Sequence, residues 1–165
     1  MRTFIPSLVA VVLVLTAGCA AWRKSPDMTL RFHEQVDANL PSAYAQVIEF
    51  PRANLRIHVA VAATLTERDV QEATIVETAG GAAVMLKFDV HGAIKLEELT
   101  TRGRGRYVVA LLDGKPVAAV LLEQRLTTGQ FLLEGDFTDD QARQLADSLN
   151  AGAANQQRRW LNEKW

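Results

Sequence analysis

The chain has 165 residues, a formal net charge of −1 and a single cysteine. A near-neutral charge argues against binding driven by nucleic-acid phosphates, and one cysteine allows neither an intrachain disulfide framework nor a zinc site built from cysteine pairs. With 48% hydrophobic and 22% charged residues, the composition is that of a folded globular protein.

The N-terminus has the layout of a secretory signal peptide. Arg2 provides a positive end, residues 4–15 are mostly apolar, and small residues lead up to Cys19. Two other interpretations stay open, an uncleaved membrane helix and a cleaved signal with an incidental cysteine. The apolar run is shorter than the ~20 residues that a membrane-spanning helix needs.

The residues around Cys19 resemble the lipobox of bacterial lipoproteins, with Ala17 and Gly18 directly before the cysteine and Thr16 where the family most often has leucine. The resemblance implies a signal peptide over residues 1–18, cleavage between Gly18 and Cys19, and lipidation of Cys19. Ala20 follows the cysteine where aspartate would favour inner-membrane retention, so the resemblance implies an outer-membrane anchor that faces the periplasm.

The first half of the mature chain is predicted to begin with a polar tether at residues 19–29 and an N-terminal strand extension at residues 30–52. A further strand with alternating apolar residues follows at 54–61. Thr66 and Asp69 have the spacing of a helix capping pair, which predicts a short helix over residues 67–72.

Two strands are predicted on either side of the glycine turn at residues 79–81. Asp89 is expected to cap a helix over residues 90–101. Asp113–Gly114 stands between two apolar runs, which is a strong hairpin signal. Pro116 lacks a backbone donor and therefore places the second hairpin strand at a sheet edge.

The last predicted elements are a strand at residues 129–135 and a closing helix. Thr138 and Gln141 have the spacing of a capping box at the start of this helix, which is expected to end at residues 150–152, before a polar tail at residues 153–165. The whole pattern predicts an α+β fold, a two-layer sandwich in which helices cover one face of a mostly antiparallel sheet.

The run "LDGKPVAAV…TTGQFLLEGDFTDDQARQLADSLNAG" resembles the head subdomain of the first periplasmic region of SecD, a protein-translocase subunit. Upstream, "LTERDVQEATIVETAGGAAVMLKFDVHGAIKLEELT" resembles the same family, and we assign residues 53–152 to such a module. The resemblance implies the head fold and a role in contacting unfolded or secreted polypeptide. It does not extend to translocation itself, because the family's membrane helices have no counterpart after Cys19.

No catalytic, metal or cofactor site is predicted. His33, His58 and His91 are isolated in the sequence, and Asp89 with His91 falls short of a zinc ligand set. Neither a serine nucleophile elbow nor a phosphate-binding loop is present.

Two further groups of residues each allow two interpretations. The "RGRGR" cluster at residues 102–106 is either a solvated loop or an anion or headgroup site. Trp160 and Trp165 in the tail either pack on the domain or form a docking peptide.

We therefore expect a non-enzymatic, lipid-anchored envelope protein that binds a protein partner, with strand addition beside Pro116 as the binding mode. Two alternatives remain. One is a structural lipoprotein that binds glycan or peptidoglycan, and the other is an enzyme whose site is assembled from distant residues.

Overall fold

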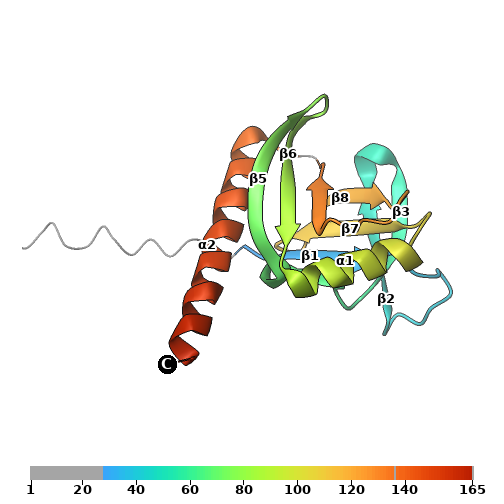
Figure 1. Cartoon of the computed structure of the whole chain (residues 1–165). Helices are drawn as coiled ribbons and strands as arrows, with labels where there is room; N and C mark the ends of the chain where they lie inside the picture. Colours follow the sequence, from blue (N-terminus) through green and yellow to red (C-terminus); the bar gives the residue numbers. More distant parts are fainter. Residues whose placement is uncertain (1–27, 136, 165) are drawn as a thin grey trace, which may run out of the picture.

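The computed structural model describes residues 28–135 and 137–164. Within these ranges the chain forms nine strands, two α-helices and two short 3₁₀-helices (Figure 1). In chain order they are β1 (Leu30–Glu34), β2 (Ala45–Phe50), η2 (Pro51–Ala53), β3 (Leu55–Ala60), β4 (Leu65–Thr66), η3 (Glu67–Asp69), β5 (Val70–Thr78), β6 (Gly81–Phe88), α1 (Val90–Arg102), β7 (Tyr107–Leu112), β8 (Lys115–Leu121), β9 (Gln130–Leu133) and α2 (Asp139–Glu163).

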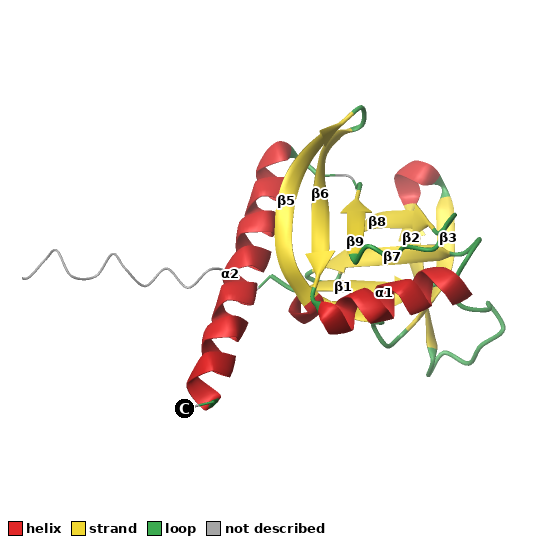
Figure 2. Ribbon diagram, viewed as in Figure 1, coloured by secondary structure: helices red, strands yellow, loops and turns green. Residues whose placement is uncertain are grey.

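The described strands pair in three antiparallel sheets (Figure 2). The first has the order β4-β1-β7-β8, the second is the β2-β3 hairpin, and the third has the order β5-β6-β9. Both helices contact the third sheet. The α+β class and the antiparallel pairing predicted from the sequence are confirmed, while the strands divide among several small sheets.

The β7-β8 hairpin forms at the predicted turn. Asp113 and Gly114 adopt positive φ angles of 50° and 77°, as a two-residue type I′ turn requires. The register shifts at a β-bulge further along the hairpin: Leu111 of β7 pairs with Pro116 of β8, whereas Ala110 pairs with Ala118. Pro116 lies on β8, which is an edge strand, as predicted.

Phe32 of β1 joins the first and third sheets. Its ring meets Phe88 of β6 edge-on at 6.2 Å and Phe131 of β9 at 5.6 Å between centroids, the arrangement that aromatic quadrupoles favour. Around it lies the larger apolar core, to which both sheets and both helices contribute. A smaller core on the other face of the first sheet packs Val109 and Leu111 of β7 against Ile57 and Val59 of β3.

The start of α1 is fixed by two carboxylates. Asp89 accepts a hydrogen bond from the Gly92 N–H at 2.7 Å, which confirms its predicted role as a cap. Asp69 accepts from Lys95 Nζ at 2.6 Å and from the Thr66 N–H at 2.8 Å. Burial raises the pKa of Asp69, but these donors outweigh it and hold the pKa below its usual value.

Helix α2 runs along the outer edge of β5, where none of the described strands pairs with it. Asn150 takes the place of such a strand. The Ala73 N–H donates to Asn150 Oδ1 at 2.8 Å, and Asn150 Nδ2 donates to the Ala73 carbonyl at 2.8 Å. The helix begins at the predicted capping box of Thr138 and Gln141 and buries the stripe Ala142, Leu145, Ala146 and Leu149.

Two predicted helix boundaries were wrong. The helix expected over residues 67–72 is only the 3₁₀ turn η3, because pairing with β6 draws the chain into β5 from Val70 onward. The closing helix does not end at residues 150–152 and instead continues to Glu163. Gly152 costs helix stability, but the alanines and glutamines around it favour the helix and no packing opposes it.

The N-terminal predictions lie mostly outside the described residues. Gly18, Cys19 and Ala20, and with them the signal peptide and the cleavage site, belong to this part of the chain. The end of the predicted tether is described, and there Thr29 N–H donates to Asp113 Oδ1 at 2.9 Å. β1, from the predicted extension, lies between β4 and β7 in the first sheet.

We predict that Asn150→Ala lowers the free energy of unfolding by about 1–3 kcal/mol, because the N–H and C=O of Ala73 then lose their partners in a part-buried place. Urea unfolding followed by circular dichroism measures this change. Asn162→Ala is the matched control on the exposed part of the same helix, where alanine stabilises by a few tenths of a kcal/mol through helix propensity. Equal effects of the two substitutions would contradict the edge-pairing role.

Candidate functional site

The outer edge of β8 is the candidate binding site. β8 pairs with β7 on one side and is the last strand of its sheet. The Leu122 N–H donates to the Arg106 carbonyl at 2.9 Å on the β7 side. Because backbone groups alternate in direction along an antiparallel strand, the N–H and C=O groups of Ala119 and Leu121 point away from β7.

One pocket lies beside the first half of this edge, with a volume of about 550 Å³. Its walls come from β8, from the segment after β9 and from the end of the β2-β3 hairpin. The hairpin contributes the apolar side chains Phe50, Pro51 and Leu55, while Glu49, Arg52 and Glu134 are polar side chains of the same lining.

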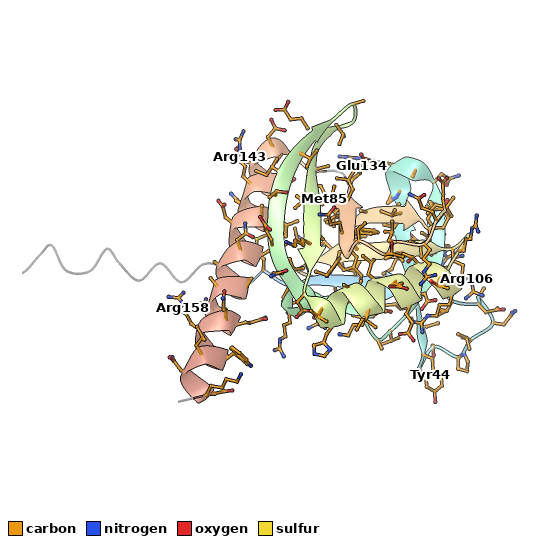
Figure 3. All side chains as sticks on the ribbon, in the orientation of Figure 1. Tyr44, Met85, Arg106, Glu134, Arg143 and Arg158 are labelled. Atoms are coloured by element: carbon orange, nitrogen blue, oxygen red, sulfur yellow. The ribbon has the colours of Figure 1, made fainter. Side chains whose placement is uncertain are left out.

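A second pocket of about 360 Å³ lies beside the other half of β8. Leu121 of β8, Met85 of β6 and Phe131 and Leu132 of β9 supply apolar lining. β9 is itself the last strand of its sheet, so two strand edges line this pocket. Figure 3 labels Met85 and Glu134, one from each pocket.

Gly135 brings the chain after β9 against β8. A Cβ at this position would lie 2.4 Å from the Val117 carbonyl oxygen and 2.8 Å from the Phe137 ring, closer than any side chain permits. Glycine is therefore required for the approach that builds one wall of the larger pocket.

These features form a groove along a sheet edge, bordered by apolar side chains and by unpaired backbone groups. In other proteins, exposed sheet edges can accept an extended polypeptide as a further strand, with alternate side chains entering neighbouring pockets. Within the described residues no group of three or more His, Cys, Asp or Glu side chains lies close enough to hold a metal ion. Neither described helix is both long and apolar enough to cross a bilayer.

The model of the SecDF P1 head subdomain matches residues 44–155, more than half of the chain. The chain belongs to this family. The match begins earlier than the sequence motifs indicated, so the β2-β3 hairpin, which borders the larger pocket, belongs to the P1 head as well.

Individual relatives agree with this assignment. Protein translocase subunit SecDF of Thermus thermophilus is 33% identical over 90 residues, which cover 54% of this chain and 12% of the relative. Protein translocase subunit SecD of Sebaldella termitidis is 34% identical over 71 residues, which cover 42% of this chain and 18% of the relative. The chain therefore corresponds to a small part of each relative.

Solved structures show the same fold. The crystal structure of SecDF in the super-membrane-facing form matches with a TM-score of 0.59 and 23% identity, over 78% of this chain and 19% of that one. A structure titled as that of a membrane component SecDF that enhances protein export matches with a TM-score of 0.57 and 24% identity, over 75% of this chain and 62% of that one. The predicted resemblance to the SecD head is thereby confirmed.

The P1 head keeps the three histidines apart. His33 is buried, with Nδ1 2.8 Å from the Ala60 carbonyl oxygen. His58 is half-buried on β3 and His91 is exposed on α1. Asp89 caps α1, and this role explains why an aspartate lies two residues before His91.

The arginine cluster at residues 102–106 is bound largely within the domain. Arg102 forms an ion pair with Glu34 at 2.9 Å, and Arg104 Nε donates to the Glu123 carbonyl at 3.1 Å. Arg106 is exposed (Figure 3). These contacts favour the interpretation as a loop between α1 and β7.

Sequence reasoning identified the edge at Pro116 but missed the pocket walls. Phe50, Pro51 and Leu55 were assigned to the N-terminal extension or to a separate strand, yet they lie beside β8. The only signal for them was the apolar pattern of the two strands, which does not say where a hairpin packs.

We predict that the amide protons of Ala119 and Leu121 exchange rapidly with deuterium in the isolated protein, whereas those of Ala118 and Val120, which face β7, are protected. Native-state exchange followed by NMR measures all four. Uniform protection along β8 would mean that its outer edge is covered.

Proposed function

We propose that this protein is a non-enzymatic, lipid-anchored envelope protein whose P1 head module binds an extended segment of a partner polypeptide along β8. The observation that carries the proposal is the unpaired edge of β8 between two apolar-lined pockets. Exported or unfolded protein is the partner class, because such chains expose both backbone groups and apolar side chains.

Strand addition suits this edge for energetic reasons. Backbone hydrogen bonds to Ala119 and Leu121 provide affinity that does not depend on sequence, while the pockets favour apolar side chains in the bound segment. The hairpin partner β7 is buried on both faces (Val108–Leu111), so β8 rests on a rigid support and little ordering cost falls on the protein. Pro116 prevents pairing at the start of the strand and limits association between copies.

The names of the relatives support the partner class. The curated relatives are protein translocase subunits, and one solved relative is described as enhancing protein export. This chain spans only 18% and 12% of the first two relatives, and the role proposed for it is contact with the polypeptide.

The proposed location follows from the N-terminus. Cys19 carries the lipid anchor after cleavage behind Gly18, and the head lies on the periplasmic side of the outer membrane. The family supports a periplasmic, membrane-associated position for the P1 head.

We predict that the protein binds reduced, carbamidomethylated α-lactalbumin, a permanently unfolded chain, and that binding protects the amides of Ala119 and Leu121. Leu121→Gln is expected to weaken binding about tenfold, because an apolar contact is lost and a polar amide is buried in its place. Fluorescence anisotropy measures the affinity and NMR exchange measures the protection.

The matched control is Ile75→Gln on β5. Ile75 is 43% exposed and Leu121 is 41% exposed, but Ile75 lines neither pocket beside β8. Its substitution should leave the affinity within a factor of two. Equal losses for both variants, or binding without protection of the β8 amides, would overturn the assignment of the site.

We predict that the protein isolated from bacterial membranes begins at Cys19 and carries covalently bound acyl chains, as mass spectrometry of the intact chain would detect. Cys19→Ser should abolish this modification, because a hydroxyl cannot replace the thiolate in thioether formation. Thr16→Leu is the control and should retain it. An unmodified wild-type chain would refute the anchor without affecting the groove.

A further inference from the structure

The second half of α2 extends past the domain (Figure 1). Leu149 is the last buried residue of the helix, and from Asn155 onward every described residue is exposed. The projecting segment, from Asn155 to the helix end at Glu163, has nine residues, a length of about 14 Å. Helices of this length are marginal in water by themselves, so a surface that covers this segment would stabilise it.

The large apolar side chains of the projecting segment are Trp160 and Leu161. At 100° per residue, Ala153 and Trp160 continue the direction of the buried residues Leu145 and Leu149, while Leu161 lies about 100° further around the helix. Trp160 is 56% exposed and Leu161 is 45% exposed. Ala153 is half-buried and lines a pocket with Val70 and Asp89 of the domain. Beyond it, Trp160 continues the direction of the stripe and is exposed.

The same segment is basic. Residues 153–164 contain Arg158, Arg159 and Lys164 against the single acidic residue Glu163. Lys164 Nζ lies 4.0 Å from the centroid of the Trp160 ring. Arg158 donates hydrogen bonds within its own helix, to Asn155 Oδ1 at 2.7 Å and to the Ala154 carbonyl. Figure 3 shows Arg143 and Arg158 near opposite ends of α2.

We infer that the projecting segment of α2 binds the surface of an anionic phospholipid bilayer. Tryptophan prefers the headgroup region of a bilayer, and arginine and lysine extend their apolar stems along it while their charges meet lipid phosphates. At 100° per residue, Trp160, Lys164 and Leu161 spread over about 100° of the helix circumference, with Arg159 beyond the Trp160 end of this arc and Arg158 beyond the Leu161 end. Apolar side chains flanked by basic ones are the composition of an interfacial helix.

The proposed anchor brings this segment within reach of the membrane, and in this respect the inference rests on the proposed function. Nine Cα–Cα steps separate Cys19 from Met28, so the described domain starts at most about 30 Å from the lipidated residue. A single tether leaves the orientation of the domain open. Contact through α2 adds a second attachment and orients the head on the membrane, with β8 on another side of the domain (Figure 1).

The test uses full-length protein purified from membranes and reconstituted into vesicles that contain brominated lipids. Trp22→Phe and Trp165→Phe leave Trp160 as the only tryptophan in the sequence. In vesicles with 30% phosphatidylglycerol we expect a blue-shifted emission and strong quenching by bromine. In pure phosphatidylcholine, or after Arg158→Gln with Arg159→Gln, the quenched fraction should fall at least twofold, because each basic side chain near an anionic surface favours binding about fivefold.

Arg143→Gln with Lys87→Gln is the matched control, since it removes the same charge from exposed side chains elsewhere in the domain and should leave the quenching unchanged.

Unshifted Trp160 emission in acylated, vesicle-bound protein would overturn the inference and leave the anchor intact. Equal quenching in both lipids would refute the charge dependence, and burial of Trp160 only when other envelope proteins are present would assign the segment to a protein. Missing acylation, seen in the mass, would refute the anchor alone.

Discussion

Unpaired backbone groups at sheet edges are the constraint on which this structure depends. Three small antiparallel sheets present more edges than one large sheet would, and each buried edge must find hydrogen-bond partners. On β5 the partner is a helix, because Asn150 offers its side-chain amide to both backbone groups of Ala73. At β4 the chain turns directly into a 3₁₀-helix closed by the capping box of Thr66 and Asp69. Among the described residues the outer edge of β8 has no such partner, and together with the edge of β9 it borders the candidate groove.

The rigidity of that edge comes from the packing of β7. Alternate residues of β7 point into two different cores, Val108 and Ala110 toward the aromatic cluster around Phe32, and Val109 and Leu111 toward the β2-β3 hairpin. A strand buried on both faces cannot shift its register without exposing one apolar set. β8 inherits this fixed position through the hairpin at Asp113–Gly114, so its outward backbone groups are held in place before any partner arrives.

The proposed activities occupy separate parts of the molecule. The groove lies beside β8 and β9, whereas the basic and aromatic end of α2 extends from the far side of the third sheet (Figure 1). Membrane attachment through Cys19 and α2 would leave the groove free, so a polypeptide could be bound at a defined height above the bilayer.

Local interactions determined what could be predicted from the sequence alone. The caps at Asp89 and Thr138, the type I′ turn at Asp113–Gly114 and the edge position of Pro116 depend on residues within a few positions of one another, and the family motifs combine the same local features. The division into three sheets, the place of α2 against β5 and the walls of the larger pocket depended on contacts between distant residues, such as Phe50 with β8 and Asn150 with Ala73. Only the tertiary structure decided these, because a side chain far along the chain has no local pattern that says which edge or face it will meet.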